Sequence, residues 1–342
     1  MILGDLGADV IKIERSGVGD ESRTWGPPFD ERGESAYFLS CNRNKFSLAA
    51  DLDLEADRQL VRRLVAGADV VIDNFRPGML AARALDPATL LGDNRRLVWC
   101  TITGFGPEST RPGYDYVLQA ESGWMSVTGE VGGAPMKVGI ALADVIAGKD
   151  AAIAVLAMLA GARSGSPAER HLFVSLQHSA TSALVNVAQN ALVSGHDAQR
   201  WGNAHPNLVP YELFAAADRP IVIAVGNDAQ FAALAGALSA TELGDHRFAT
   251  NPGRLRHRIE IVEAIRSRVA RRPAGEWIES LTSAGVPCGV VRTVREALAD
   301  VRASPASGIA PLGPGSVRRP APTLDEHGAL IRAHGWNGVA LA

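Results

Sequence analysis

The chain has 342 residues, a length typical of about two domains. Hydrophobic residues make up 46% of it and charged residues 21%, and the formal net charge is −3. These values fit a globular protein, and they exclude an intrinsically disordered chain and a basic surface for nucleic acid. The cysteines Cys41, Cys100 and Cys288 form no CxxC pair, zinc-binding spacing or disulfide framework, so we expect no metal site and a reducing, cytoplasmic compartment.

The first part of the chain shows a strand pattern, a long polar stretch and a helix pattern. Residues 8–14 alternate like a strand, and residues 15–44 are polar and rich in Gly and Pro, without periodicity. After the apolar segment 46–52, Asp53 is expected to be the N-cap of a helix that Gly67 closes. The apolar face of this helix is formed by Leu60, Val61, Leu64 and Val65.

The alternation of strands and helices continues along the chain. Short strands are expected at residues 70–72, 97–102 and 170–176, and helices around residues 87–91 and over 177–193. Strands that alternate with helices predict βαβ units and therefore an α/β fold with a parallel sheet.

The longest apolar stretch, residues 138–162, is long enough to suggest a membrane span. Asp144, Lys149 and Asp150 interrupt it, so we interpret it as a buried helix and expect no membrane partner. The many alanines of this helix allow neighbouring backbones to approach closely.

A change of pattern near residue 200 predicts a second, smaller α/β domain. Gly, Asn, His and Pro cluster at residues 200–210, and a new series of strands and helices starts with the apolar strand 220–225. A tail rich in Pro and Gly follows at residues 305–322. The expected division is a large domain at 1–196, a linker at 197–210, a small domain at 211–300 and a return of 301–342 to the large domain.

Two acidic residues lie where a carboxylate can do chemistry. Asp144 stands among apolar residues at the expected start of the long helix, where the helix dipole keeps a carboxylate ionised. Such a carboxylate can be a nucleophile toward an activated acyl group, or it can simply be the N-cap of its helix. Asp115, in the turn PGYD, is a second functional candidate, and the alternative is an Asx-turn residue.

Basic residues recur in the loops that follow the expected strands. Since open α/β sheets bind ligands at the carboxyl ends of their strands, these residues, with flat faces from Trp25 and Phe75, suit a phosphorylated ligand that contains adenine. The alternative is a set of solvated loop cations. The residues are Arg15, Arg23, Arg43, Lys45 and Arg76.

Nine segments, taken in order, resemble the family III CoA-transferases, a group that includes a branch of acyl-CoA racemases. The resemblance runs through almost the whole chain. Its segments are GDLGADVIKIE (4–14), GD with Arg23 and WGPP (19–28), NRNK (42–45), NFRPG (74–78), ITGFG (102–106), PGYD (112–115), Ala143 with Asp144, GNAHP (202–206) and GVPCG (285–289).

The resemblance implies a Rossmann-like parallel sheet, an interlocked homodimer and a covalent route for CoA transfer. Asp144 matches the nucleophilic aspartate of the family, and Asp115 matches an acidic residue near its active site. The route implies an anhydride and then an aspartyl-CoA thioester on Asp144, with backbone N–H groups at the helix start as donors to the oxyanion. The substrates are an acyl-CoA and a small carboxylate, and no permanently bound cofactor is expected.

The resemblance also implies where CoA binds. The segments of the family that bind CoA correspond here to Arg15, Lys45, Asn74, Phe75, Arg76, Pro112, Gly113 and Tyr114. The turn that contains Gly202, Asn203 and His205 corresponds to a flexible loop over the substrate site.

Three departures from the family pattern leave alternatives open. Tyr114 stands where the racemase branch has a catalytic histidine, which disfavours a racemase or isomerase. Phe46 and Ala82 stand where basic contacts to CoA are common. The sequence opens inside the helix that usually follows the family's first strand, which predicts an exposed sheet edge and motivates the alternative of a CoA-binding homologue without catalysis.

Overall fold

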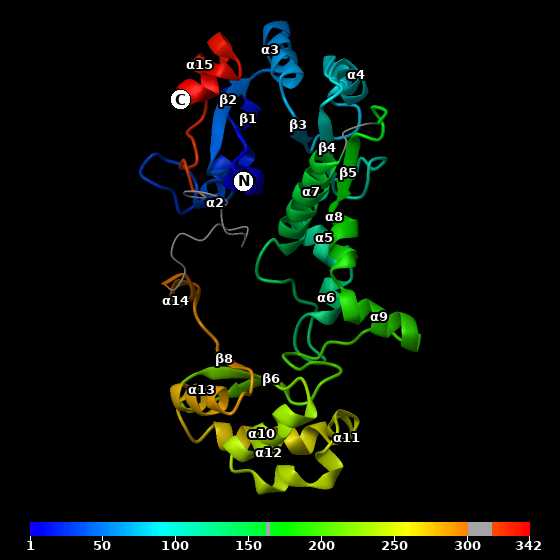
Figure 1. Ribbon diagram of the computed structural model, residues 1–342, viewed down its shortest axis with the longest axis vertical. Coiled ribbons are helices and arrows are strands. Elements are labelled where there is room, and N and C mark those ends of the chain that lie inside the picture. The colour runs from blue at the N-terminus through cyan, green and yellow to red at the C-terminus, as the bar shows by residue number, and fades with distance from the viewer. Residues whose placement is uncertain (162–164, 300–316) are drawn as a thin grey trace. The chain divides into compact units, whose positions relative to one another are not determined.

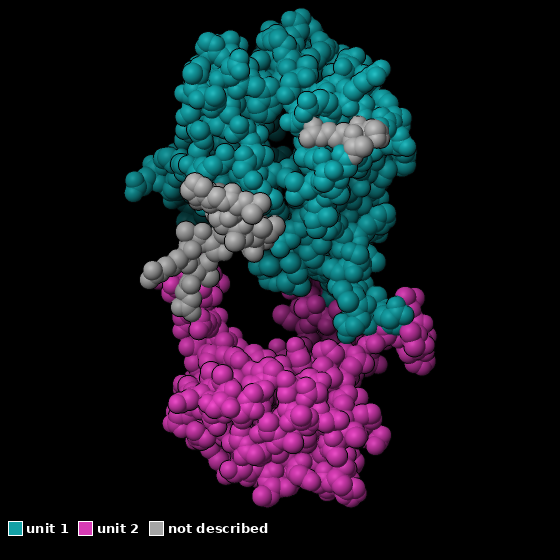
Figure 2. All heavy atoms as spheres, viewed as in Figure 1, with its two compact units in different colours: residues 1–124, 138–189, 303–342 teal, residues 125–137, 190–302 magenta. Residues whose placement is uncertain are grey.

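The computed structural model describes residues 1–161, 165–299 and 317–342 (Figure 1). The end of the apolar stretch, at residue 162, and residues 305–316 of the tail lie outside the described residues. The chain divides into two compact units, coloured separately in Figure 2. Unit 1 comprises Met1–Trp124, Val138–Gln189 and Ala303–Ala342, and unit 2 comprises Met125–Lys137 and Asn190–Arg302.

Unit 1 contains a two-stranded parallel sheet near the N-terminus. In it β1 (Val10–Arg15) pairs with β2 (Lys45–Ala50). The apolar side chains of β2 pack against neighbouring helices and form one hydrophobic cluster with them. The helices around this sheet are α1 (Ile2–Asp5), α2 (Ala36–Asn42), α3 (Glu55–Ala66), α15 (Gly328–His334) and α16 (Asn337–Leu341), with a 3-10 turn at Glu21–Thr24.

A second parallel sheet of unit 1 has three strands, β3 (Val70–Asp73), β4 (Val98–Thr103) and β5 (His171–Ser175), in this order. We expected one parallel sheet. Among the described strands, β1 and β2 pair only with each other, so the parallel strands of unit 1 form two separate sheets. Helices linked to this sheet are α4 (Pro87–Asp93), α5 (Asp115–Glu121), α7 (Leu142–Ala160) and α8 (Leu176–Ser182), with a 3-10 turn at Ala81–Arg83. α6 (Trp124–Val127) and α9 (Val185–Ser194) each run from unit 1 into unit 2.

The long apolar helix expected from the sequence is α7, and its small residues pack against the second sheet. Ala143, Ala147 and Ala151 are almost fully buried in a cluster with Cys100 of β4 and Val174 of β5. Alanine at these positions lets the helix backbone lie close to the strands. The described helices include none with the length and apolar character needed to cross a bilayer.

Unit 2 is built on an antiparallel sheet of β6 (Tyr211–Ala215), β7 (Pro220–Ala224) and β8 (Cys288–Val290). Buried residues of β6 and β7 form a core with the helices of this unit. The helices are α10 (Asp228–Ala237), α11 (Asn251–Arg256), α12 (Arg258–Val269), α13 (Ala274–Ser283) and α14 (Val294–Ala299), with 3-10 turns at Thr241–Gly244 and His246–Phe248.

Some local expectations are confirmed and others are wrong. Gly67 closes α3 as expected, but the N-cap is Leu54 rather than Asp53, whose side chain instead pairs with Arg83. The helix expected over 177–193 is two helices, because Val185 has a φ of 43°, which ends helical geometry there. The polar stretch 15–44 contains α2 and a 3-10 turn.

A buried ion network holds that polar stretch to the first sheet. Arg23 binds Glu14 of β1 through Nε and Nη2, each at 2.8 Å, and binds Glu34 through Nη1 at 2.7 Å. Burial opposes ionisation of Glu14, yet the hydrogen bonds from Arg23 and Ser47 hold its pKa below the ordinary range. Arg23 is therefore a structural cation rather than a free ligand-binding one.

We expect Glu14→Gln to lower the free energy of unfolding by about 3 kcal/mol, because it leaves the buried Arg23 without the carboxylate that binds it through two hydrogen bonds. Urea denaturation of purified variants measures the change. The matched control is Glu55→Gln, the same chemical change in an exposed pair with Arg58, for which we expect about 0.5 kcal/mol or less. Equal losses in the two variants would contradict the structural role of the network.

Candidate active site

Asp144 lies in the first turn of α7, where the sequence predicted it. The N-cap of α7 is Ala141, which makes no side-chain capping hydrogen bond, so the interpretation of Asp144 as an ordinary N-cap is wrong. The residue as a whole is exposed at the start of the helix, while its carboxyl group is partly withdrawn from water by the atoms around it.

The cap of α7 comes instead from another helix. Asp115, the first residue of α5, accepts hydrogen bonds through Oδ1 from the backbone N–H of Ala143 at 2.8 Å and of Asp144 at 3.4 Å. Its carboxylate thus satisfies N–H groups that have no partner within the helix. The two acidic candidates of the sequence are therefore in direct contact, and Oδ1 of Asp115 accepts from α7 rather than from the backbone of its own turn.

The remaining backbone N–H groups at the start of α7 are also engaged. Leu142 N–H donates to the carbonyl of Ile140 at 2.9 Å, and Val145 N–H donates to the carbonyl of Ala141 at 3.1 Å. The expectation that these N–H groups donate to an oxyanion is therefore not met by this arrangement, because Asp115 and the chain itself already accept from them.

Burial and a like charge raise the pKa of Asp144. Removal of water is the larger cause and the negative charge of Asp115 is the second, and together they raise it to about 6. The charge of Asp144 also acts on Tyr37 of α2, since burial and then this charge raise the pKa of the Tyr37 hydroxyl. No pattern in the sequence pointed to Tyr37.

One residue that supports Asp115 and the neighbouring loop was also missed in the sequence. Gln119 of α5 is fully buried, and its Nε2 donates to Oδ2 of Asp115 at 2.7 Å and to the carbonyl of Ile140 at 3.1 Å. Its Oε1 accepts from the N–H of Val138 at 2.8 Å. The sequence did contain a pattern that could have indicated this contact: a glutamine four residues after Asp115, which lies one helical turn further along a helix.

The loop that carries Asp115 rests on a contact between two glycines. A Cβ atom on Gly113 would lie 2.4 Å from Cα of Gly104, and a Cβ on Gly104 would lie 2.7 Å from Cα of Gly113. Both are far shorter than any real contact, so the two backbones meet because neither residue has a side chain. Pro112 and Tyr114, beside Gly113, are exposed.

The segment that contains Asn74, Phe75 and Arg76 follows β3, and all three side chains are exposed. Asp73, the last residue of β3, holds this loop by accepting a hydrogen bond through Oδ1 from the N–H of Phe75 at 2.9 Å. Its Oδ2 accepts from Trp99 Nε1 at 2.6 Å and from Thr101 Oγ1 at 2.8 Å.

The other basic candidates differ in their surroundings. Arg15 is exposed at the end of β1, whereas Lys45 at the start of β2 donates to Oδ1 of Asn42 at 2.8 Å. Burial, and then the charge of Lys12, lower the pKa of Lys45 to about 8, so it is not a solvated loop cation. Arg43 binds both carboxylate oxygens of Asp5, at 3.0 and 2.7 Å, and is a structural cation like Arg23.

The turn 202–206 belongs to unit 2. Gly202 and Asn203 are exposed, and His205 is held by its N–H, which donates to the carbonyl of Tyr211 at 2.9 Å. Burial, and then Arg258, lower the pKa of His205.

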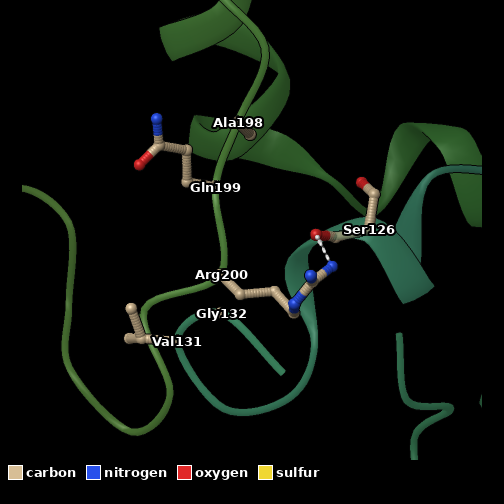
Figure 3. A pocket seen from close by; sticks show the side chains of 6 residues that line it. All are labelled: Ser126, Val131, Gly132, Ala198, Gln199 and Arg200. Carbon is tan, nitrogen blue, oxygen red and sulfur yellow. Dashed lines mark hydrogen bonds between the residues drawn. The ribbon is translucent and has the colours of Figure 1, made fainter. Parts of the chain in front are cut away.

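Arg200, two residues before this turn, joins it to a Gly-rich loop of the same unit. Its Nη1 donates to the carbonyl of Ser126 at 3.2 Å (Figure 3), and its Nη2 donates to the carbonyl of Gly133 at 2.7 Å. A pocket of about 320 Å³ lies here, lined by Ser126, Val131, Gly132, Ala198, Gln199 and Arg200.

The described part of the chain contains no group of three or more His, Cys, Asp or Glu residues placed to hold a metal ion. Within the unit, the structure brings Asp115 and Asp144 together and adds Gln119 and Tyr37 to them.

Comparison with known proteins identifies the family of the chain. Residues 1–323 match the sequence profile of CoA-transferase family III. The succinate–glutarate CoA-transferase of Agrobacterium fabrum is 41% identical over 309 residues, which cover 87% of this chain and 77% of that protein. The chain belongs to CoA-transferase family III. The family inferred from the nine sequence segments is therefore confirmed.

Further relatives support the assignment to the family III CoA-transferases. The succinyl-CoA:glutarate CoA-transferase of Mus musculus is 37% identical over 309 residues, which cover 88% of this chain and 70% of that protein. A solved structure of a CAIB/BAIF family protein from Brucella suis has a TM-score of 0.81 and 38% identity, and the match covers 97% of this chain and 93% of that chain. As a CoA-transferase, the chain acts on CoA thioesters as substrates.

We expect Gly113→Ala to lower the free energy of unfolding by about 2 kcal/mol, because the added methyl group overlaps the backbone of Gly104 and forces the two loops apart. Thermal denaturation measures the effect. The matched control is Gly148→Ala in α7, where a Cβ meets no neighbouring atom and the exchange raises stability by about 0.5–1 kcal/mol. A Gly113→Ala protein as stable as the parent would show that the glycine contact is not required.

Proposed function

We propose that this CoA-transferase moves CoA from an acyl-CoA donor to a small carboxylate acceptor, with Asp144 as the covalent nucleophile. The observation that carries the proposal is the pair of carboxylates at the start of α7, where Asp144 is displayed in the first turn and Asp115 caps the helix. Relatives named for succinyl-CoA, succinate and glutarate support a dicarboxylate acceptor and make succinyl-CoA the first donor to test.

Each step of the route exchanges one acyl bond for another. The Asp144 carboxylate attacks the thioester carbonyl, the C–S bond breaks, and CoA leaves as a thiolate while a mixed anhydride forms. The thiolate then attacks the Asp144 carbonyl, which releases the donor carboxylate and leaves an aspartyl-CoA thioester. The acceptor carboxylate attacks this thioester, the C–S bond breaks, and a second anhydride forms as CoA leaves as a thiolate. The thiolate then attacks the acceptor carbonyl of this anhydride, which gives the new acyl-CoA and frees Asp144.

The state of Asp144 in the resting protein suits the first step. With a pKa of about 6 the carboxylate is ionised at neutral pH and is more basic than an ordinary aspartate. Asp115 contributes by fixing the first turn of α7 and through its charge, rather than by attacking the substrate.

We assign CoA binding to Arg15 at the carboxyl end of β1, Lys45 at the amino end of β2, and the loop that follows β3. Arg15, Lys45 and Arg76 are the cations for the phosphates, and Asn74 and Phe75 lie on the loop that Asp73 holds. The segment Pro112–Tyr114 borders the acyl end of the ligand, because it leads into Asp115. The turn of Gly202, Asn203 and His205 is assigned to the acceptor side.

We also propose that the enzyme is an interlocked homodimer. Large apolar side chains of unit 1 are exposed in the single chain, among them Ile153 of α7 (65%) and Phe173 of β5 (48%), and a second subunit would cover such side chains. The family resemblance supports the interlocked form.

We expect Asp144→Ala to lower kcat by about four orders of magnitude or more, because the variant has no carboxylate to form the anhydride. The measurement is hydroxylamine trapping: the protein is incubated with succinyl-CoA, hydroxylamine is added, and peptide mass spectrometry looks for a hydroxamate at position 144. The parent is expected to carry it. Transfer retained by a folded Asp144→Ala variant would overturn the covalent route.

The charge and the capping role of Asp115 can be separated by two variants. Asp115→Asn keeps an oxygen for the N–H of Ala143 but removes the charge, so the pKa of Asp144 falls below about 6 and the acid limb of the kcat profile moves to lower pH. Asp115→Ala also removes the cap, and we expect kcat at neutral pH to fall by a further factor of about 5 to 10. An acid limb that stays in place in Asp115→Asn would show that the charge of Asp115 does not act on Asp144.

A further inference from the structure

We propose that Gln119 is a positioning residue of this active site, which acts on Asp144 by holding the carboxylate of Asp115 in place. The inference rests on the proposed function of Asp144 and extends it to a residue that does not touch the reacting atoms.

The hydrogen bonds of Gln119 account for both protons of its amide. One proton goes to Oδ2 of Asp115 and the other to the carbonyl of Ile140, while the amide oxygen accepts from the N–H of Val138. The side chain is 0% exposed, so water cannot replace any of these partners. Of the side chains of this length, only the uncharged amide donates to a carboxylate and a carbonyl while accepting from an N–H.

These three bonds join the two segments that meet at the nucleophile. Gln119 and Asp115 share one face of α5, four residues apart, and residues 138–140 lead directly into α7. Gln119 therefore fixes one carboxylate oxygen of Asp115 and the approach of α7 together. The other oxygen of Asp115 is then directed at the N–H groups of Ala143 and Asp144.

The electrostatic consequence falls on Asp144. Among the described residues, Asp115 of α5 accepts a hydrogen bond from the N–H of Asp144, and its charge acts on the Asp144 carboxyl; the charge of Asp144 in turn acts on the hydroxyl of Tyr37 of α2. The interaction of two charges weakens with distance and with access of water. If Gln119 is lost, the carboxylate of Asp115 is free to turn toward water, and the pKa of Asp144 then falls from about 6 toward its ordinary value.

The test measures the titration of Asp144 without turnover. Carbodiimide labelling of the resting protein over a range of pH, read by peptide mass spectrometry, gives the midpoint at position 144. The variants are Gln119→Met, which removes all three hydrogen bonds at similar size, and Gln119→Glu, which keeps an acceptor but loses both donors. Gln59→Met is the matched control, because Gln59 makes the same contact, four residues along a helix, with the exposed Glu55 at 3.1 Å.

We expect the Gln119→Met midpoint to shift to lower pH and kcat at pH 7 to fall about 3- to 5-fold, which is less than the loss in Asp115→Ala, with KM for the acyl-CoA little changed. The Gln59→Met control should match the parent. In an Asp115→Ala background, Gln119→Met should add no further loss of kcat, because the group it acts on is gone.

Three results would overturn the proposal. The first is an unchanged labelling midpoint of Asp144 in a folded Gln119→Met protein, and the second is a loss of kcat by Gln119→Met that adds fully to that of Asp115→Ala. The third applies when Gln119→Met does not fold, and is an unshifted midpoint of Asp144 in Gln119→Glu. The labelling separates this inference from the proposed function. A parent protein in which Asp144 titrates as described but forms no hydroxamate would reject the covalent route and leave the positioning role of Gln119 standing.

Discussion

The hydrogen bond between the Asp115 carboxylate and the first turn of α7 is the interaction on which the geometry of the site depends. It joins residues 28 positions apart, Asp115 and Ala143, at 2.8 Å. Two other contacts support this hydrogen bond. The close approach of Gly113 to Gly104 holds the loop that leads into Asp115, and Gln119 donates to the second carboxylate oxygen of Asp115. The helix start needs an acceptor and a half-buried carboxylate needs donors, so each satisfies the other.

The basic residues of this chain are of two kinds, those bound by carboxylates and those exposed to solvent. The sequence alone does not distinguish the two kinds. Arg23 and Arg43 follow strand patterns and belong to segments typical of the family, yet both are bound by carboxylates within unit 1. Arg15 and Arg76 are exposed and have their charges available to a ligand. A guanidinium bound by a buried carboxylate stabilises the fold of its loop. Breaking such a buried pair costs far more stability than breaking an exposed pair.

Periodicity and residue type predicted the strands near residues 10, 70, 98 and 171, the long helix α7 and the place of Asp144 at its start. Those features depend on local patterns. The division of the parallel strands into two sheets, the capping of α7 by Asp115 and the roles of Gln119 and Tyr37 depend on which segments meet in space, and no local pattern contains that. Asp53 illustrates what a local pattern cannot predict, because it has the residue type and the position of an N-cap but pairs with Arg83 instead.

The hydrogen bonds of Asp115 also limit how the helix start can assist catalysis. The N–H groups of Ala143 and Asp144 already donate to a carboxylate, so an oxyanion formed on the donor carbonyl meets the field of α7 and not its free donors. The negative charge of Asp115 cancels part of that field. At Asp144 the removal of water and this charge outweigh the helix dipole, since the pKa rises rather than falls. The arrangement therefore suits the role that we propose for Asp144: it gives a carboxylate more basic than usual that is still ionised at neutral pH, and in the proposed route it leaves the stabilisation of the oxyanion to groups other than the start of α7.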